Sequence, residues 1–163
     1  MKAVMISIRP EWVAKILSGE KTVEVRKTVP KLETPFKCYI YETQGRTDTP
    51  WIDEEGHTIF RGRGQVVAEF ICDKIIPIRV FNNGTIQDWN WNNLNDSCVP
   101  YDDIVRYIGN NQTGHGWHIS ELKVYAKPKS IGFFKVRQTN KVWSFQKKLE
   151  RPPQSWCYVE ELQ

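Results

Sequence analysis

Short β-rich segments recur along the whole chain, whereas only two stretches show helical periodicity, and this imbalance limits the folds that the chain can form. Runs of β-branched and aromatic residues predict strands at 3–8, 22–26, 36–41, 65–72, 117–125, 130–136 and 156–159. Because strands and helices do not alternate, a doubly wound parallel sheet is not expected. The pattern predicts an α+β fold that is mainly β, a small and mostly antiparallel β-barrel with two or more helices on its rim.

The two helical segments are defined by proline at the start, glycine at the end and an apolar face between them. Pro10 and Gly19 bound the first helix, and Pro100 and Gly109 bound the second. The apolar faces consist of Trp12, Val13, Ile16 and Leu17 in the first, and of Tyr101, Ile104, Val105 and Ile108 in the second.

Two segments look like insertions into this pattern. Residues 43–64 predict a hairpin with Gly56 in its turn. Residues 82–97 contain six Asn among sixteen residues, together with Trp89 and Trp91, and predict a long irregular loop pinned by its tryptophans. Neither segment predicts a separate domain, so we expect a single domain over residues 1–163 of the 163-residue chain.

Composition and cysteine spacing indicate a cytoplasmic protein that neither spans a membrane nor binds a cofactor. No stretch approaches the roughly 18 uncharged apolar residues of a membrane span, and the N-terminus lacks a signal-peptide pattern. The four cysteines are far apart, without the C-x-x-C spacing of a zinc or redox site, so we expect reduced thiols; they are Cys38, Cys72, Cys98 and Cys157.

Charge is unevenly distributed along the chain. Residues 1–37 have eight Lys/Arg against four Asp/Glu, residues 38–122 six against twelve, and residues 123–163 nine against three. If the fold brings the two basic ends together, they offer a surface for a polyanion. A merely solubilising surface is the alternative that charge alone favours.

One short motif contains the strongest functional signal, the pattern G-x-K-x-x-E-x-R at Gly19–Arg26. Strict alternation after the turn puts Val23 and Val25 on one face of a strand, and Glu24 and Arg26 on the other, with Lys21 at its mouth. Two cations and a carboxylate on a concave face suit a phosphate or carboxylate together with a base edge or amide. The alternative is an ion pair that only stabilises the barrel.

Further residues outside the motif are candidates for ligand contacts. Arg9 ends the first strand and adds a third cation if that strand lies beside the motif; otherwise it is solvated. Trp12, Trp117 and Trp156 offer stacking surfaces for a base, although large aromatic residues are more often in the core, and the apolar face of the first helix favours the core most strongly for Trp12. His118 is a candidate base-contacting or acid–base residue. His115 and His118 fall on opposite faces of a strand, which disfavours a shared metal ion, so no metal site is predicted.

The motif and its flanks resemble the ASCH domain, a member of the PUA-like superfamily of small β-barrels. The resemblance rests on Gly19–Arg26, on the preceding segment 7–18 and on two C-terminal segments, 115–120 and 152–159. It covers roughly residues 1–42, 64–80 and 115–162, and leaves the 43–64 hairpin and the 82–97 loop outside. It implies a single PUA-like domain with these two segments as insertions.

The resemblance implies that the protein binds RNA, a nucleotide or a modified nucleoside in a cationic cleft built on Lys21, Glu24 and Arg26. It also implies an alternative, because some ASCH proteins are amidohydrolases that deacetylate N4-acetylcytidine-type nucleosides and others are reported as ribonucleases. In those amidohydrolases a lysine matching Lys21 takes part in catalysis. This sequence has Glu24 where they have a candidate threonine nucleophile, so a hydrolase here would use Lys21 and Glu24 as an acid–base pair.

Cations and aromatic residues are interleaved between residues 123 and 151, where the only acidic residue is Glu150. This composition is typical of surfaces that bind RNA or single-stranded DNA without sequence preference. It is equally typical of a barrel wall with aromatic residues inside and lysines outside.

Overall fold

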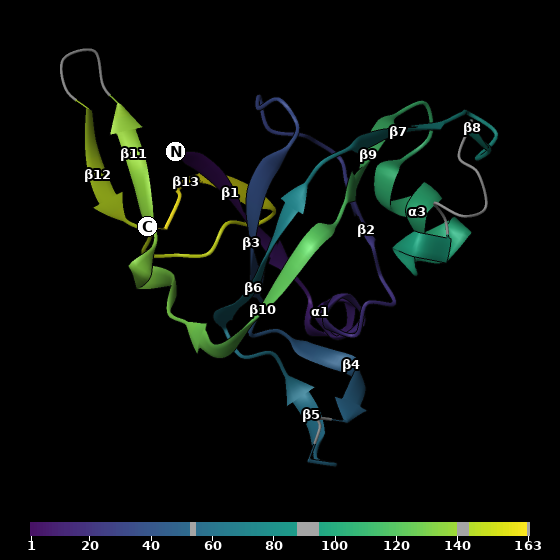
Figure 1. Ribbon diagram of the computed structural model, residues 1–163. Helices are drawn as coiled ribbons and strands as arrows, with labels where there is room; N and C mark the ends of the chain where they lie inside the picture. Colours follow the sequence, from purple (N-terminus) through teal and green to yellow (C-terminus); the bar gives the residue numbers. More distant parts are fainter. Residues whose placement is uncertain (53–54, 88–94, 140–143, 163) are drawn as a thin grey trace.

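The computed structural model describes residues 1–52, 55–87, 95–139 and 144–162. Strands dominate and lie in two sheets and two hairpins (Figure 1). The two predicted helices are confirmed as α1 (Pro10–Leu17) and α3 (Tyr101–Ile108). A 3₁₀ turn, η1 (Ile131–Phe133), lies where the sequence predicts the start of a strand, so the predicted strand 130–136 is wrong in its first half.

The larger sheet has five strands in the order β10-β6-β3-β1-β13. β1 pairs in parallel with β3, and the other neighbours are antiparallel. Its strands are β1 (Lys2–Ile8), β3 (Phe36–Glu42), β6 (Gln65–Cys72), β10 (Ser120–Lys129) and β13 (Trp156–Glu160).

The smaller sheet has four antiparallel strands in the order β2-β9-β7-β8. They are β2 (Val23–Arg26), β7 (Ile75–Val80), β8 (Ile86–Gln87) and β9 (Thr113–His118). The chain passes from one sheet to the other twice within one or two residues, from β6 to β7 and from β9 to β10. Among the described residues no strand pairing closes the two sheets into a barrel, so the mainly β, mostly antiparallel prediction is confirmed and the closed barrel is not.

Two hairpins extend from these sheets. β4 (Arg46–Ile52) pairs with β5 (Thr58–Arg61) within the predicted hairpin segment 43–64. β11 (Lys135–Thr139) pairs with β12 (Ser144–Lys148) near the C-terminus. In the Asn-rich segment 82–97, β8 is a short strand, and residues 88–94, with Trp89 and Trp91, lie outside the described part of the chain.

Alternating side chains fill three apolar clusters. Val4, Ile6 and Ile8 of β1 face α1, while Ala3 and Met5 face the opposite side, toward η1 and β11. Both faces of the larger sheet are therefore covered, which explains the continuous apolar run of the first strand. The third cluster lies between the smaller sheet and α3. No helix of the described residues is long and apolar enough to cross a membrane.

Candidate functional site: a pocket beside a buried ion triad

A glycine turn positions the motif at the junction of the two sheets. Gly19, with φ +79°, ends α1 in the left-handed conformation that glycine adopts without strain. The backbone N–H of Lys21 donates to the Lys15 carbonyl at 2.9 Å, and that of Thr22 donates to the Asp96 carbonyl at 2.8 Å. These bonds fix the path of the chain between α1 and β2.

The predicted alternation along β2 is confirmed, but both of its faces are buried. Val23 and Val25 pack in the apolar cluster under α3. Glu24 and Arg26, each 7% exposed, lie on the opposite face, and Lys21 is 1% exposed. The motif is therefore a buried polar cluster rather than a row of surface charges.

Lys21 has a complete set of hydrogen-bond acceptors. Its Nζ lies 2.8 Å from the Val23 carbonyl, 2.5 Å from the Ser97 carbonyl and 3.2 Å from Glu24 Oε2. The same Nζ lies 5.3 Å from the centroid of the Trp12 ring. An ammonium group has three N–H donors, so these three acceptors match its full capacity.

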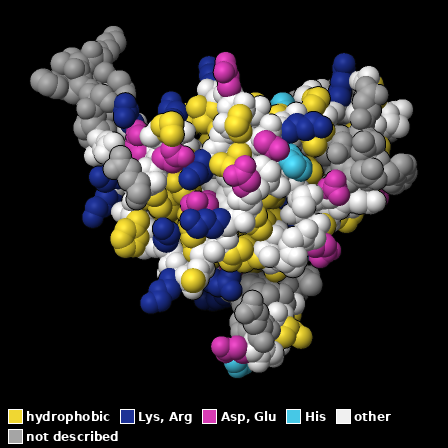
Figure 2. All heavy atoms as spheres, viewed as in Figure 1, with side chains coloured by type: hydrophobic (Ala, Val, Ile, Leu, Met, Phe, Trp, Pro, Cys, Tyr) yellow, Lys and Arg dark blue, Asp and Glu magenta, His cyan; other side chains and the backbone are white. Residues whose placement is uncertain are grey.

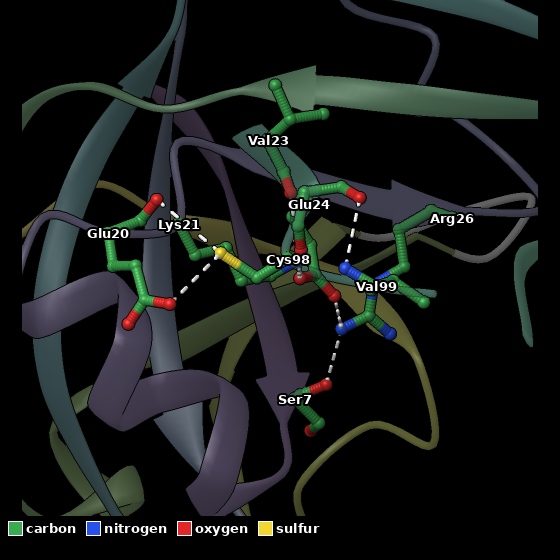
Figure 3. A network of polar contacts seen from close by, with 9 residues as sticks. Ser7, Glu20, Lys21, Val23, Glu24, Arg26, Cys98 and Val99 are labelled. Carbon is green, nitrogen blue, oxygen red and sulfur yellow. Dashed lines mark hydrogen bonds and ion pairs between the residues drawn. The ribbon is translucent and has the colours of Figure 1, made fainter. Parts of the chain in front are cut away.

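Glu24 lies between the two cations (Figure 3). Its Oε1 is 2.9 Å from Arg26 Nη2, and its Oε2 faces Lys21. Arg26 Nη2 also donates to the Ser7 carbonyl at 2.7 Å, and Nη1 donates to Ser155 Oγ at 3.2 Å. Arg26 Nε is buried and has no hydrogen-bond partner among the described residues. We call Lys21, Glu24 and Arg26 the buried triad.

The buried triad forms part of the wall of a pocket of about 620 Å³. This volume lies in the range of about 300–1,000 Å³ that is typical of small-molecule sites. The walls come from β1, α1, β2, α3 and the segment before β13. The lining residues are Ser7, Ile8, Arg9, Trp12, Lys21, Glu24, Val25, Arg26, Thr43, Val99, Asp103, Ile104, Tyr107, Gln154 and Ser155.

The lining of the pocket carries more positive than negative charge. Lys21, Arg26 and Arg9 are cationic, and Glu24 and Asp103 are acidic. Asp103 already forms an ion pair of 2.9 Å with Arg106, which lies outside the lining. One buried carboxylate therefore faces two buried cations, and the surplus positive charge favours an anionic occupant.

Two predicted ligand-contacting residues lie elsewhere. Trp117 is 0% exposed and packs against Phe36 with a centroid distance of 5.7 Å, so it belongs to the core. His118 lies outside the pocket lining, and its Nδ1 is 2.6 Å from Asp73 Oδ1. This hydrogen bond holds the pKa of the Asp73 carboxyl below its usual value. Of the predicted site residues, Arg9, Lys21, Glu24 and Arg26 line the pocket, and Trp117 and His118 do not.

The two histidines of the H-x-x-H spacing pair with different residues of β2. His115 lies opposite Arg26 in the register, and His118 lies opposite Val23. Burial lowers the pKa of His115. Within the described part of the chain, no group of three or more His, Cys, Asp or Glu side chains has the arrangement of a metal site.

Two aromatic side chains form walls of the pocket, and the sequence indicated only one of them. Trp12 lines the pocket from α1, although its place on the apolar face of that helix suggested a core residue. Tyr107 lines it from α3, and its ring lies 5.2 Å from Lys27 Nζ. Tyr107 falls outside the apolar i, i+3, i+4, i+7 set of its helix, so an aromatic residue off the core face was the only sign in the sequence that it lines a pocket.

Comparisons with known proteins agree with this architecture. No protein-family model and no curated protein matches the sequence. Crystal structures of an ASCH protein from Zymomonas mobilis, however, superpose on nearly the whole chain. The unmutated Zymomonas mobilis protein superposes with a TM-score of 0.60 at 16% sequence identity, and the alignment covers 98% of this chain and 88% of that protein's chain. Two mutant forms give TM-scores of 0.62 and 0.61 at 16% and 17% identity, covering 98% and 99% of this chain and 89% and 92% of their own. The chain has the ASCH-domain fold.

Proposed function

We propose that the pocket beside the buried triad binds a nucleotide, either free or within RNA, or a modified nucleoside. The observation that most supports this proposal is the charge imbalance of the triad, in which Lys21 and Arg26 share the single carboxylate of Glu24. Buried charges without full compensation are costly, and an anionic ligand supplies the missing negative charge.

Arg26 offers the donor for this anion. Its Nε is buried without a partner among the described residues, in a side chain that lines the pocket. Guanidinium groups bind phosphate and carboxylate with directed N–H donors. Arg9, also in the lining, adds a second cation for the same anion.

The remaining lining supports a planar, polar ligand such as a nucleobase. Trp12 and Tyr107 come from different helices and provide aromatic surfaces, and bases stack on such rings whatever their sequence. The hydroxyls of Ser7, Thr43 and Ser155 and the amide of Gln154 provide donors and acceptors around them. The resemblance of the motif to the ASCH domain implies the same ligand class.

The geometry supports binding more than hydrolysis. A general base needs a lone pair that can take a proton from the substrate. The three acceptors around Lys21 Nζ match the three N–H donors of an ammonium group, which has no lone pair. Each oxygen of Glu24 faces a cation. The pair is therefore arranged to hold charge in place rather than to transfer a proton.

Titration calorimetry with the four ribonucleoside 5′-monophosphates, the matching nucleosides and inorganic phosphate tests this proposal. We expect one-to-one binding of at least one monophosphate and weaker binding of its nucleoside. Arg9→Gln, a substitution at an exposed residue, should weaken binding of the monophosphate and leave binding of the nucleoside unchanged. Trp12→Leu should weaken both. If no monophosphate or nucleoside binds to the folded protein, the proposal is wrong.

A further inference from the structure

The hairpin β11–β12 is a two-stranded ribbon that forms a sheet of its own among the described residues. In its register, Lys135 lies opposite Lys148, and Arg137 lies opposite Gln146. Residues directly opposite each other on a ribbon have their side chains on the same face. Lys135 and Lys148 are therefore neighbours on one face, and both are exposed.

The cations of this hairpin fall into two groups. Arg137 pairs with Glu160 at 2.9 Å, and Lys147 pairs with Glu150 at 3.1 Å. Lys135 and Lys148 form no ion pair within the described part of the chain. Like charges directly opposite each other destabilise a strand pair, so this arrangement leaves two cations available to a polyanion.

The segment that leads into the hairpin extends the same character. Lys127 and Lys129 lie at the end of β10, and Lys129 Nζ lies 4.5 Å from the Tyr125 ring. Phe133 in η1 is 68% exposed, although it is a large apolar side chain. Figure 2 shows Lys and Arg side chains recurring on the side of the molecule where β10 leads into the hairpin. We call Lys127, Lys129, Phe133, Lys135 and Lys148 the basic hairpin surface.

We propose that the basic hairpin surface is a second binding site, separate from the pocket, that holds a single-stranded nucleic acid. Lys135 and Lys148 contact successive phosphates, and Phe133 provides a face on which a base stacks. A single exposed aromatic residue beside unpaired lysines suits a strand with accessible bases better than a duplex, whose bases are stacked on one another. If the pocket holds a nucleotide within RNA, this surface binds another part of the same RNA, and only that link rests on the proposed function.

Fluorescence anisotropy with a labelled 12-nucleotide oligouridine tests the surface in the full chain. We expect the double variant Lys135→Gln/Lys148→Gln to weaken binding by about tenfold at low salt. Loss of two phosphate contacts should also reduce the slope of log affinity against log salt by about 1.4, since each contact on a single strand contributes about 0.7. The matched control Lys31→Gln/Lys74→Gln removes the same charge from two other exposed lysines and should keep the wild-type slope.

A second variant separates stacking from charge. Phe133→Ala should weaken the oligouridine about fivefold or more while leaving the salt slope unchanged. Unlabelled polyglutamate of equal charge should compete poorly with the oligouridine, because it has the negative charge but no bases to stack on Phe133. Equal losses in the two lysine double variants, or full competition by polyglutamate, would overturn the proposal.

The pocket and this surface fail independently. Trp12→Leu should weaken mononucleotide binding and keep the lysine-dependent salt slope, whereas Lys135→Gln/Lys148→Gln should keep mononucleotide binding and reduce the slope. A wild-type protein that binds mononucleotides but shows no salt-dependent oligouridine binding would contradict the hairpin site alone.

Discussion

The protein contains two pairs of cations in opposite environments. In the buried triad, Lys21 and Arg26 are almost fully buried, and both form hydrogen bonds to fixed partners, at distances between 2.5 and 3.2 Å. In the basic hairpin surface, Lys135 and Lys148 are exposed and face each other without a carboxylate between them. The comparison shows that positive charge alone does not define a site, because burial and fixed partners determine whether a cation positions a ligand or only attracts one.

The two environments also differ in energetic cost. Removing one partner of a buried ion pair costs about 3–5 kcal/mol, because the other charge remains buried. An exposed pair contributes about 0–1 kcal/mol. The same type of substitution should therefore lower the free energy of unfolding much more in the buried triad than in the basic hairpin surface.

The largest expected effect is that of Glu24→Gln. It leaves Lys21 and Arg26 buried without a counter-charge, and we expect the free energy of unfolding to fall by about 3–5 kcal/mol. Glu150→Gln, which breaks the exposed pair with Lys147 at the hairpin, should cost about 1 kcal/mol or less. Urea denaturation followed by circular dichroism measures both, and equal losses would remove the distinction between the two regions.

Arg26→Lys should have a smaller but clear effect. Lysine keeps the charge but cannot reproduce the fork that contacts Glu24, the Ser7 carbonyl and Ser155. Because hydrogen bonds to charged groups contribute about 1.5–3 kcal/mol, we expect a loss of about 2 kcal/mol. The same change at exposed Arg137 should cost well under 1 kcal/mol. A similar loss at both positions in urea melts would argue against a geometric role for Arg26.

Acidification should lower stability through His115 in the smaller sheet and not through the lysines of the hairpin β11–β12. Burial lowers the pKa of His115, opposite Arg26, below its usual 6.5. As the pH falls below 6.5, the unfolded chain binds the proton first, so the stabilisation present above that pH is lost as the pH approaches the lowered pKa. Comparing unfolding at pH 7.5 and 5.5, His115→Gln should show a shallower loss than the wild type, and Lys135→Gln/Lys148→Gln should show the wild-type loss. An unchanged loss in His115→Gln would contradict this.

The smallest expected effect has the opposite sign. Lys135→Gln/Lys148→Gln removes a repulsive cross-strand pair, so we expect the hairpin variant to gain a few tenths of a kcal/mol. Thermal melts at low and high salt measure the gain, which should shrink as salt screens the repulsion. A clear destabilisation would show that the two lysines support the fold rather than a partner.

The sequence predicted the elements that local patterns determine. Both helices follow from their apolar spacing and bounding residues, and the faces of β2 follow from strict alternation at Val23–Arg26. Burial of the polar face could not be predicted, because the partners of Arg26 come from β1 at Ser7 and from Ser155, which is 129 residues away along the chain. The Ser97 carbonyl that contacts Lys21 likewise comes from the end of the Asn-rich segment, and Ser97 is 76 residues from Lys21 along the chain.

The two tryptophans show the same limit at single residues. The apolar helix face favours the core for Trp12, and Trp117 is a predicted ligand contact. In the structure Trp12 packs against the core and also lines the pocket, whereas Trp117 is fully buried. An apolar helix face is wider than the contact it makes, so its edge can line a pocket. Which side of β9 is covered depends on Phe36 and Trp156, and local sequence does not report these contacts.

The indole N–H signals of the tryptophans report directly on whether a ligand enters the pocket beside the buried triad. A proton–nitrogen NMR titration with cytidine 5′-monophosphate, repeated with the other three monophosphates, should shift the Trp12 indole signal, assigned by Trp12→Phe. The Trp117 signal, from a side chain that lies in the core and outside the pocket lining, should move little. Shifts confined to the basic hairpin surface, with the Trp12 signal unchanged at saturating nucleotide, would contradict the account.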